Sequence, residues 1–184
     1  MESGNSYCHA VSELEDNHIH KMYHDHHYGF PIKNDNELFE RLVLEINQAG
    51  LSWTTILRKQ EYFRKAYDGF EIDKVAQYQE MDIARLLSDS GIIRNRLKIN
   101  AAIYNAKVLQ GIQKEYGSFY QWLEHHHPLT KEEWTTLFKK TFHFTGGEIV
   151  NEFLMSTGYL PGSHVFDCPI YQKTIQAGAA WSRE

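Results

Sequence analysis

The chain has 184 residues and a formal net charge of −5, with 42% apolar, 23% charged and 14% aromatic residues. This composition is typical of a globular protein large enough to bury a core, and excludes fibrous and disordered classes. No apolar run approaches the about 18 residues of a membrane span, and the polar N-terminus MESGNSYCHAVSELEDNH does not resemble a secretion signal. We therefore expect a cytoplasmic protein that folds as one domain over residues 1–184. The acidic balance disfavours nucleic-acid binding unless basic residues gather locally.

Helix signals follow one another along the chain, and strand alternation is hard to find. Asn34 or Asp35 can cap the first clear helix, and Thr130 with Glu133 has the spacing of a capping box. Helices are predicted at about 34–48, 53–67, from 73 over a short stretch, 82–90, 95–115, 119–126, 131–140 and 147–157. The sequence therefore predicts an all-α fold with short connections.

Glu45 lies in the stretch LVLEINQAGLSW, where a leucine would be expected. On a helical wheel it falls about 20° from Leu38, inside the apolar stripe. One interpretation pairs it with Arg41, one turn earlier, so that both side chains reach water. The other places Glu45 in a dry pocket, where a carboxylate is costly unless it meets a cation or strong donors. In that case the partner is a ligand, and Trp53 follows directly as a large aromatic surface.

Four candidate metal ligands lie in the segments 1–30 and 159–184, which we expect to be irregular. They are Cys8, His24, His164 and Cys168. His-x3-Cys is an acceptable spacing for two ligands of one zinc ion, and two sulfurs with two imidazoles would close a tetrahedral structural site. Such a site would pack the two terminal segments together.

Other histidines compete for these positions, and coincidence is a rival explanation for the His-x3-Cys pair. The competitors are His9, His18, His20, His26 and His27. Asp25 and Asp167 are placed to orient ligand imidazoles. The tract EHHHP, residues 124–128, is better explained as a solvated helix end, where histidine is favourable.

A basic patch covers GIIRNRLKINAAIYNAK, residues 91–107. It contains Arg94, Arg96, Lys98 and Lys107 and no acidic residue. Basic side chains beside the N–H groups of a helix start suit a DNA phosphate, as in a helix-hairpin-helix element. A solvated basic helix start would have the same sequence pattern.

Four segments together resemble the DNA-3-methyladenine glycosylase I family, in family order and over nearly the whole chain. They are YHDHHYGFP, LFERLVLEINQAGLSWTTILRKQEYFRKAYDGF, SGIIRNRLKI and GSHVFDCP. LEINQAGLSWTTIL is the most specific part. The resemblance implies a helix-hairpin-helix glycosylase with one structural zinc ion, held by the four ligands named above.

The resemblance also implies roles for residues that bind a damaged base. Glu45 matches the glutamate of the base pocket, Trp53 the stacking tryptophan and Tyr23 a pocket tyrosine. The implied substrate is double-stranded DNA with alkylated bases, and 3-methyladenine would be flipped out and released by hydrolysis. No lysine is placed convincingly for a Schiff base, so we expect a monofunctional enzyme without lyase activity. We expect a monomer, in the cytoplasm and associated with the nucleoid while it acts.

Several positions depart from the family pattern and put the range of substrates in doubt. They are His20, His27, Tyr28, Leu97, Glu148 and Glu152. Two further hypotheses therefore stay open. The pair His24-Asp25 is also typical of metal-dependent phosphohydrolases, which need an open metal position. A DNA-binding homologue that has lost turnover is the other.

Overall fold

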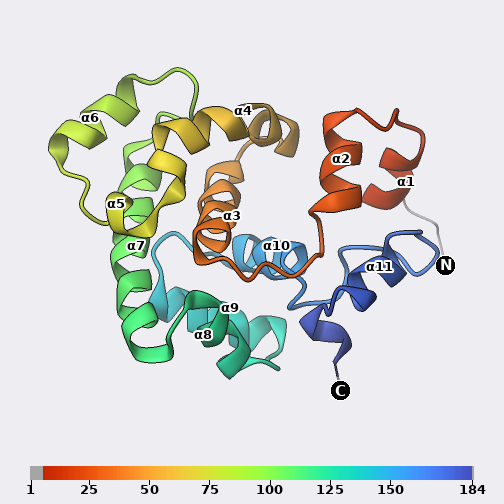
Figure 1. Ribbon diagram of the computed structural model, residues 1–184. Helices are drawn as coiled ribbons and strands as arrows, with labels where there is room; N and C mark the ends of the chain where they lie inside the picture. Colours follow the sequence, from red (N-terminus) through yellow and green to blue (C-terminus); the bar gives the residue numbers. More distant parts are fainter. Residues whose placement is uncertain (1–5, 184) are drawn as a thin grey trace. The chain divides into compact units, whose positions relative to one another are not determined.

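The computed structural model describes residues 6–183, and every regular element in that range is helical. The chain forms two compact units: residues 1–31 with 151–184, and residues 32–150 (Figure 1). Within the described residues, no helix is long and apolar enough to cross a membrane. The predicted all-α class is confirmed.

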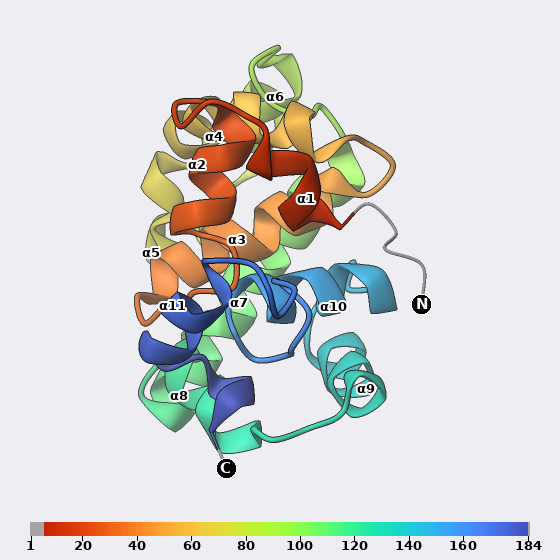
Figure 2. The ribbon, with the colours of Figure 1, turned by 90° about the vertical axis from the view of Figure 1, so that its right-hand side faces the viewer.

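The unit of residues 32–150 contains the longer helices. These are α3 (Asp35–Gln48), α4 (Trp53–Ala66), η1 (Asp68–Phe70), α5 (Ile72–Val75), α6 (Glu80–Ser88), α7 (Arg96–Tyr116), α8 (Phe119–His126) and α9 (Lys131–Thr141). Helix α10 (Gly147–Ser156) begins here and ends in the other unit. The longest helix, α7, contacts α3, α5, α6 and α8 (Figure 2).

Side-chain caps set most of these helix starts, as the sequence predicts. The side-chain oxygen Oδ1 of Asn34 accepts hydrogen bonds from the backbone N–H groups of Asn36 and Glu37 at 2.9 and 3.1 Å. These bonds satisfy two otherwise unpaired donors of α3. Thr130 and Glu133 form the predicted capping box at the start of α9. The predicted boundaries therefore agree with the structure to within a few residues.

The core of this unit is aromatic and aliphatic, and α3 lies within it. Leu38, Phe39 and Leu42 of α3 are completely buried. Phe39 meets Phe70 edge-to-face at 6.0 Å, and Tyr67 stacks on Phe70 at 5.4 Å. Burial of nearly the whole circumference of α3 means that any charged group on it is removed from water.

The unit of both chain ends contains α1 (Tyr7–Ser12), α2 (Ile19–His26), the end of α10, α11 (Tyr171–Gln176) and η2 (Ala180–Ser182). The expectation that these segments are irregular is therefore wrong. Ser6 caps α1 and His18 caps α2 through side chains that accept backbone N–H groups. Helices of six to eight residues are too short to show a clear apolar period, so the sequence pattern missed them.

Close backbone approach joins the two chain ends within this unit. The Gly29 N–H donates to the Ser156 carbonyl at 2.9 Å. Gly29 has φ +81°, and a Cβ atom there would overlap the Ser163 side chain. Only glycine fits this contact without strain. Ser163 directly precedes His164, so the contact positions one of the candidate metal ligands.

Candidate functional site

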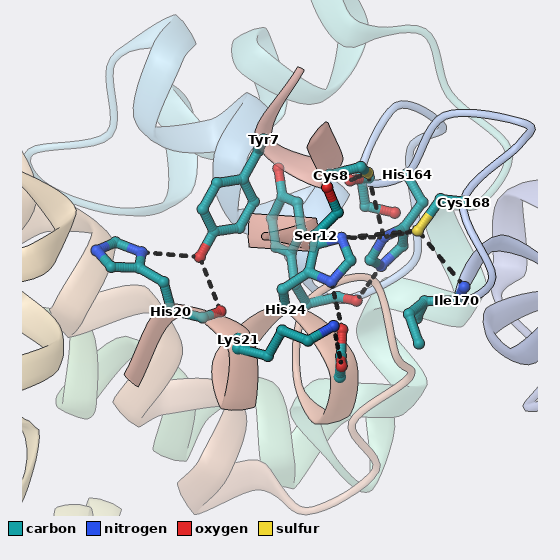
Figure 3. Close-up of polar contacts among 12 residues, drawn as sticks. Tyr7, Cys8, Ser12, His20, Lys21, His24, His164, Cys168 and Ile170 are labelled. Atoms are coloured by element: carbon teal, nitrogen blue, oxygen red, sulfur yellow. Dashed lines mark hydrogen bonds and ion pairs between the residues drawn. The ribbon is translucent and has the colours of Figure 1, made fainter. Parts of the chain in front are cut away.

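The four candidate metal ligands meet in one buried cluster of the unit formed by the chain ends (Figure 3). Cys8 comes from α1, His24 from α2, and His164 and Cys168 from the loop before α11. Their ligand atoms all lie within 4.8 Å of one another, and all four residues are buried. The structure therefore brings together side chains that are up to 160 residues apart in the sequence, as Cys8 and Cys168 are.

The distances between ligand atoms suit one small metal ion. His164 Nδ1 lies 3.1 Å from His24 Nε2, and Cys8 Sγ lies 3.7 Å from His164 Nδ1. Cys168 Sγ lies 3.7 Å from both imidazole nitrogens. Ligands around a tetrahedral ion with bonds of about 2.0–2.3 Å would be about 3.3–3.8 Å apart. The three sulfur–nitrogen distances lie in this range, and the 3.1 Å between the two imidazole nitrogens is slightly shorter.

Hydrogen bonds on the far side of each imidazole select the nitrogen that faces the cluster. Asp25 Oδ1 lies 2.6 Å from His24 Nδ1, and the Tyr28 carbonyl lies 2.7 Å from His164 Nε2. A proton on each of these nitrogens leaves His24 Nε2 and His164 Nδ1 as metal acceptors. Asp25 therefore contacts His24, one of the candidate ligand imidazoles, as the predicted orienting role requires. The role of the Tyr28 carbonyl cannot be predicted from the sequence, because every residue type has a backbone oxygen.

Burial and neighbouring charges also shift the pKa values of two candidate metal ligands and of Asp25. Burial raises the pKa of the Cys8 thiol to about 11 and lowers the pKa of His164. Burial disfavours ionised Asp25, but hydrogen bonds from His24 and Lys21 hold its pKa below the usual value. A neutral imidazole is ready to bind a metal at neutral pH, whereas the Cys8 thiol must first release its proton.

The competing histidines lie outside this cluster. His9, His18, His26 and His27 are exposed, and His20 instead lies 3.0 Å from the Tyr7 hydroxyl (Figure 3). Asp167 is 3.8 Å from the exposed His9, so its proposed role beside a ligand imidazole finds no support in this geometry.

Glu45 is buried on α3, with only 5% of its surface exposed. Arg41, one turn away, is 7% exposed. The interpretation in which both side chains reach water is therefore wrong. Trp53 is the first residue of α4 and partly buried, and Tyr23 is buried on α2 in the other unit.

Lys98 requires a correction, because it is not a surface cation. It is 5% exposed, and its ammonium donates to the carbonyls of Asn47 and Ala49 at 3.0 and 2.8 Å. Burial lowers its pKa. The predicted contact between Lys98 and DNA is replaced by an internal one, which caps the C-terminal end of α3. This contact holds the turn that separates Glu45 from Trp53.

Lys98→Met is expected to lower the free energy of unfolding by about 1–3 kcal/mol, because two carbonyls at the end of α3 lose a buried donor. Urea unfolding followed by circular dichroism measures this change. Lys107→Met, an exposed position on the same helix, is the matched control and is expected to shift stability by about 0.5 kcal/mol or less. Equal stabilities for the two variants would show that the ammonium does not support the turn.

The other three basic residues of the predicted patch, Arg94, Arg96 and Lys107, are on the surface. Arg94 is exposed in the connection before α7. Arg96 is the first residue of α7 and pairs with Glu80 at 2.8 Å. Arg94 is therefore more accessible to a phosphate than Arg96, because Arg96 would have to give up its ion pair with Glu80.

Fold and site together define an all-helical protein with a buried Cys2His2 cluster, the cage, whose donor types suit a metal ion, and with a buried carboxylate on a core helix. The methyladenine glycosylase family model matches residues 13–137. DNA-3-methyladenine glycosylase 1 of Escherichia coli is 35% identical over 172 residues, covering 83% of this chain and 91% of that protein. The chain belongs to the methyladenine glycosylase family.

Solved structures agree with this family assignment. The structure that describes 3-methyladenine recognition by 3-methyladenine DNA glycosylase I from Staphylococcus aureus is 30% identical, with a TM-score of 0.76, over 90% of this chain and 97% of that chain. A tyrosine-to-phenylalanine variant of 3-methyladenine DNA glycosylase I in complex with 3-methyladenine is 31% identical, with a TM-score of 0.74, over 85% and 94%.

Proposed function

We propose that this protein is a DNA-3-methyladenine glycosylase of base-excision repair. It hydrolyses the N-glycosidic bond of 3-methyladenine in double-stranded DNA after the nucleotide is flipped out of the stack. Family membership and the names of the relatives support this activity. The observation that carries it within this chain is the burial of Glu45 on a core helix.

Glu45 explains how such an enzyme distinguishes a damaged base from a normal one. A 3-methylated adenine in DNA is positively charged, whereas adenine is neutral. A carboxylate removed from water gains strongly from a cation and little from a neutral base. We propose that Glu45 attracts and hydrogen-bonds the methylated base and thereby provides the discrimination.

Trp53 and Tyr23 are the other proposed base-binding residues. The indole face of Trp53 suits stacking on a cationic ring, and Tyr23 provides a second aromatic surface. The electron pair of the breaking C1′–N bond neutralises the base, so this leaving group needs little general-acid help. Water adds to C1′ and releases a proton. Lys98 is the one buried lysine among residues 6–183 and donates to carbonyls, so we propose no lyase step.

We propose zinc as the ion held by Cys8, His24, His164 and Cys168. Two thiolates and two imidazoles in tetrahedral spacing are the donor set of structural zinc sites. Four protein ligands leave no open position for a water, so the ion would stabilise the packed chain ends without acting on the substrate. The same ligand count removes the support for a metal-dependent phosphohydrolase, which needs an open position.

DNA contact is proposed at two helix connections. The exposed Arg94 belongs to the first, between α6 and α7, with Arg96 beside it. The connection between α9 and α10 fits a helix-hairpin-helix element better. It is short, ends with Gly146 directly before Gly147 of α10, follows exposed Lys139 and Lys140, and presents the N–H groups of α10. We propose this hairpin as the main phosphate-binding element, in a monomer that acts on cytoplasmic, nucleoid DNA.

Release of free base from methylated duplex DNA tests the proposed function. DNA treated with dimethyl sulfate is incubated with the protein, and the released bases are separated by chromatography. We expect 3-methyladenine in the soluble fraction and intact abasic sites in the DNA, because no lyase step follows. DNA that is bound without release of any base would identify a non-catalytic homologue instead.

A further inference from the structure

One buried amide of α7 holds the backbone of the connection between α9 and α10, residues 142–146. Asn105 is completely buried. Its side-chain oxygen accepts from the His143 N–H at 2.8 Å, and its amino group donates to the His143 carbonyl at 3.1 Å. A buried amide is costly unless its polar atoms are hydrogen-bonded, and here both ends of the amide bond one residue of the connection. Asn105 therefore fixes the path of the backbone at His143.

The backbone directly after His143 has a conformation that its residue type disfavours. Phe144 has φ +61°, in the left-handed region that favours glycine. On its other side, the Thr145 hydroxyl donates to the carbonyls of Phe138 and Phe142 at 3.1 and 3.2 Å. A strained residue keeps such a conformation only where the surrounding contacts hold it. The connection is therefore held in one defined shape from both sides of Phe144.

The same side of α7 also holds the end of α3. Lys98 lies seven residues before Asn105, which returns it to nearly the same side of an α-helix. Its ammonium donates to the carbonyls of Asn47 and Ala49, and it lies 6.0 Å from the centre of the Phe144 ring. All of these residues belong to the unit of residues 32–150. Helix α7 thus fixes the α9–α10 connection relative to the turn of the proposed base site.

This connection is the element for which the main phosphate contact is proposed, and its surroundings suit an anion. Residues 139–147 contain two exposed lysines and no acidic residue. Glu148 follows, but its carboxylate pairs with Lys131 at 3.3 Å. An open hollow of about 500 Å³ borders the connection, and Lys139 and Gly146 are among its lining residues. Backbone N–H groups bind a phosphate only where the backbone places them correctly, so the contact depends on what holds the connection.

We propose that Asn105 is a positioning residue of the glycosylase reaction, which holds the α9–α10 connection in the shape that binds DNA while a base occupies the site of Glu45 and Trp53. The proposal rests on the proposed function of the preceding subsection. Asn105 is completely buried and touches no DNA itself. An element that is ordered before DNA arrives loses less conformational freedom on binding. Loss of the amide therefore weakens the binding of DNA and leaves the binding of an isolated base unchanged.

The test compares Asn105→Ala with the wild-type protein on DNA treated with dimethyl sulfate. In single-turnover release of 3-methyladenine, we expect the half-saturating DNA concentration to rise about ten-fold and the rate at saturating DNA to change by less than about two-fold. The dependence of log Kd on log salt, measured with unmodified duplex DNA, is expected to become shallower by about one phosphate contact. Affinity for free 3-methyladenine, measured by calorimetry below the Tm of the variant, is expected to stay at the wild-type value.

Asn100→Ala is the matched control, because Asn100 is exposed on the same helix, and it is expected to keep all four wild-type values. Thr145→Val removes the hydroxyl that holds the other side of the connection. It is expected to change the same two DNA measurements in the same direction, which addresses the case in which Asn105→Ala folds poorly.

A purely structural role would lower the Tm and leave the half-saturating DNA concentration and the salt dependence unchanged, or would weaken the binding of DNA and of free base equally. Either result would overturn the inference, while the proposed function would stand. Release of no base by the wild-type protein would overturn both.

Discussion

Glu45→Gln is expected to lower kcat/KM for release of 3-methyladenine by about 10²–10³-fold. The substitution keeps the shape of the side chain and removes the negative charge that we propose attracts the cationic base. Since Glu45 is buried on α3, the neutral amide costs less to bury than the carboxylate, and the helical fold is expected to remain intact. Single-turnover base release and far-ultraviolet circular dichroism, measured on the same preparation, check both parts.

Glu40→Gln is the matched control for this experiment. Glu40 is 8% exposed and lies on the same helix, but its carboxylate pairs with Arg64 at 2.9 Å and accepts from Gln60 at 2.7 Å. Its substitution is expected to lower stability with little effect on base release. Equal excision by wild-type protein and Glu45→Gln would remove Glu45 from the base site.

Cys168→Ser is expected to abolish tight metal binding and to lower Tm by an amount on the order of 10 °C. The cage draws its side chains from both chain ends, so the zinc ion that we propose there would stabilise the packing of that whole unit. Metal content by elemental analysis and Tm by scanning calorimetry are measured together. We expect one zinc ion per wild-type chain and a fraction of that in the variant.

Two further measurements separate loss of the ion from loss of a buried side chain. Chelation of the wild-type protein is expected to reproduce the lower Tm, and added zinc to restore it. Asp25→Asn keeps all four ligands and is expected to weaken metal binding by about 10–100-fold, because the His24 imidazole loses its charged partner. Metal affinity is expected to fall as the pH is lowered, since binding requires a thiolate at Cys8, whose pKa is raised to about 11. A Cys168→Ser variant that is free of zinc and as stable as the wild type would contradict the structural role.

The helices of residues 32–150 were predictable because their signals are local. The Asn34 cap, the Ser52 cap and the Thr130 capping box each form hydrogen bonds within three residues of sequence. Helices α1 and α2 have caps of the same kind but only six and eight residues. Their stability comes from packing against the other chain end, which no local pattern records.

The residues of the candidate site divide in the same way, into those with a local sequence signal and those placed by tertiary contacts. Glu45 is noticeable because a carboxylate interrupts an apolar stripe, and the cage ligands because the chain has two cysteines, one of them in a His-x3-Cys pair. The sequence pattern places Lys98 on the surface, which is wrong, because the local sequence is that of an exposed basic helix start. Its ammonium instead reaches carbonyls about 50 residues earlier in the chain, at Asn47 and Ala49.

The sequence by itself determined the all-helical class, most helix boundaries, the identity of the metal-ligand candidates and the anomaly of Glu45. Only the tertiary structure decided which imidazole nitrogens face the cage, that Lys98 points inward, and that Asn105 holds the backbone of His143. The physical reason is the separation along the sequence over which each interaction acts. Caps and apolar periodicity act between neighbours in the chain, whereas ligand geometry, burial of charge and backbone acceptors depend on segments that only folding brings together.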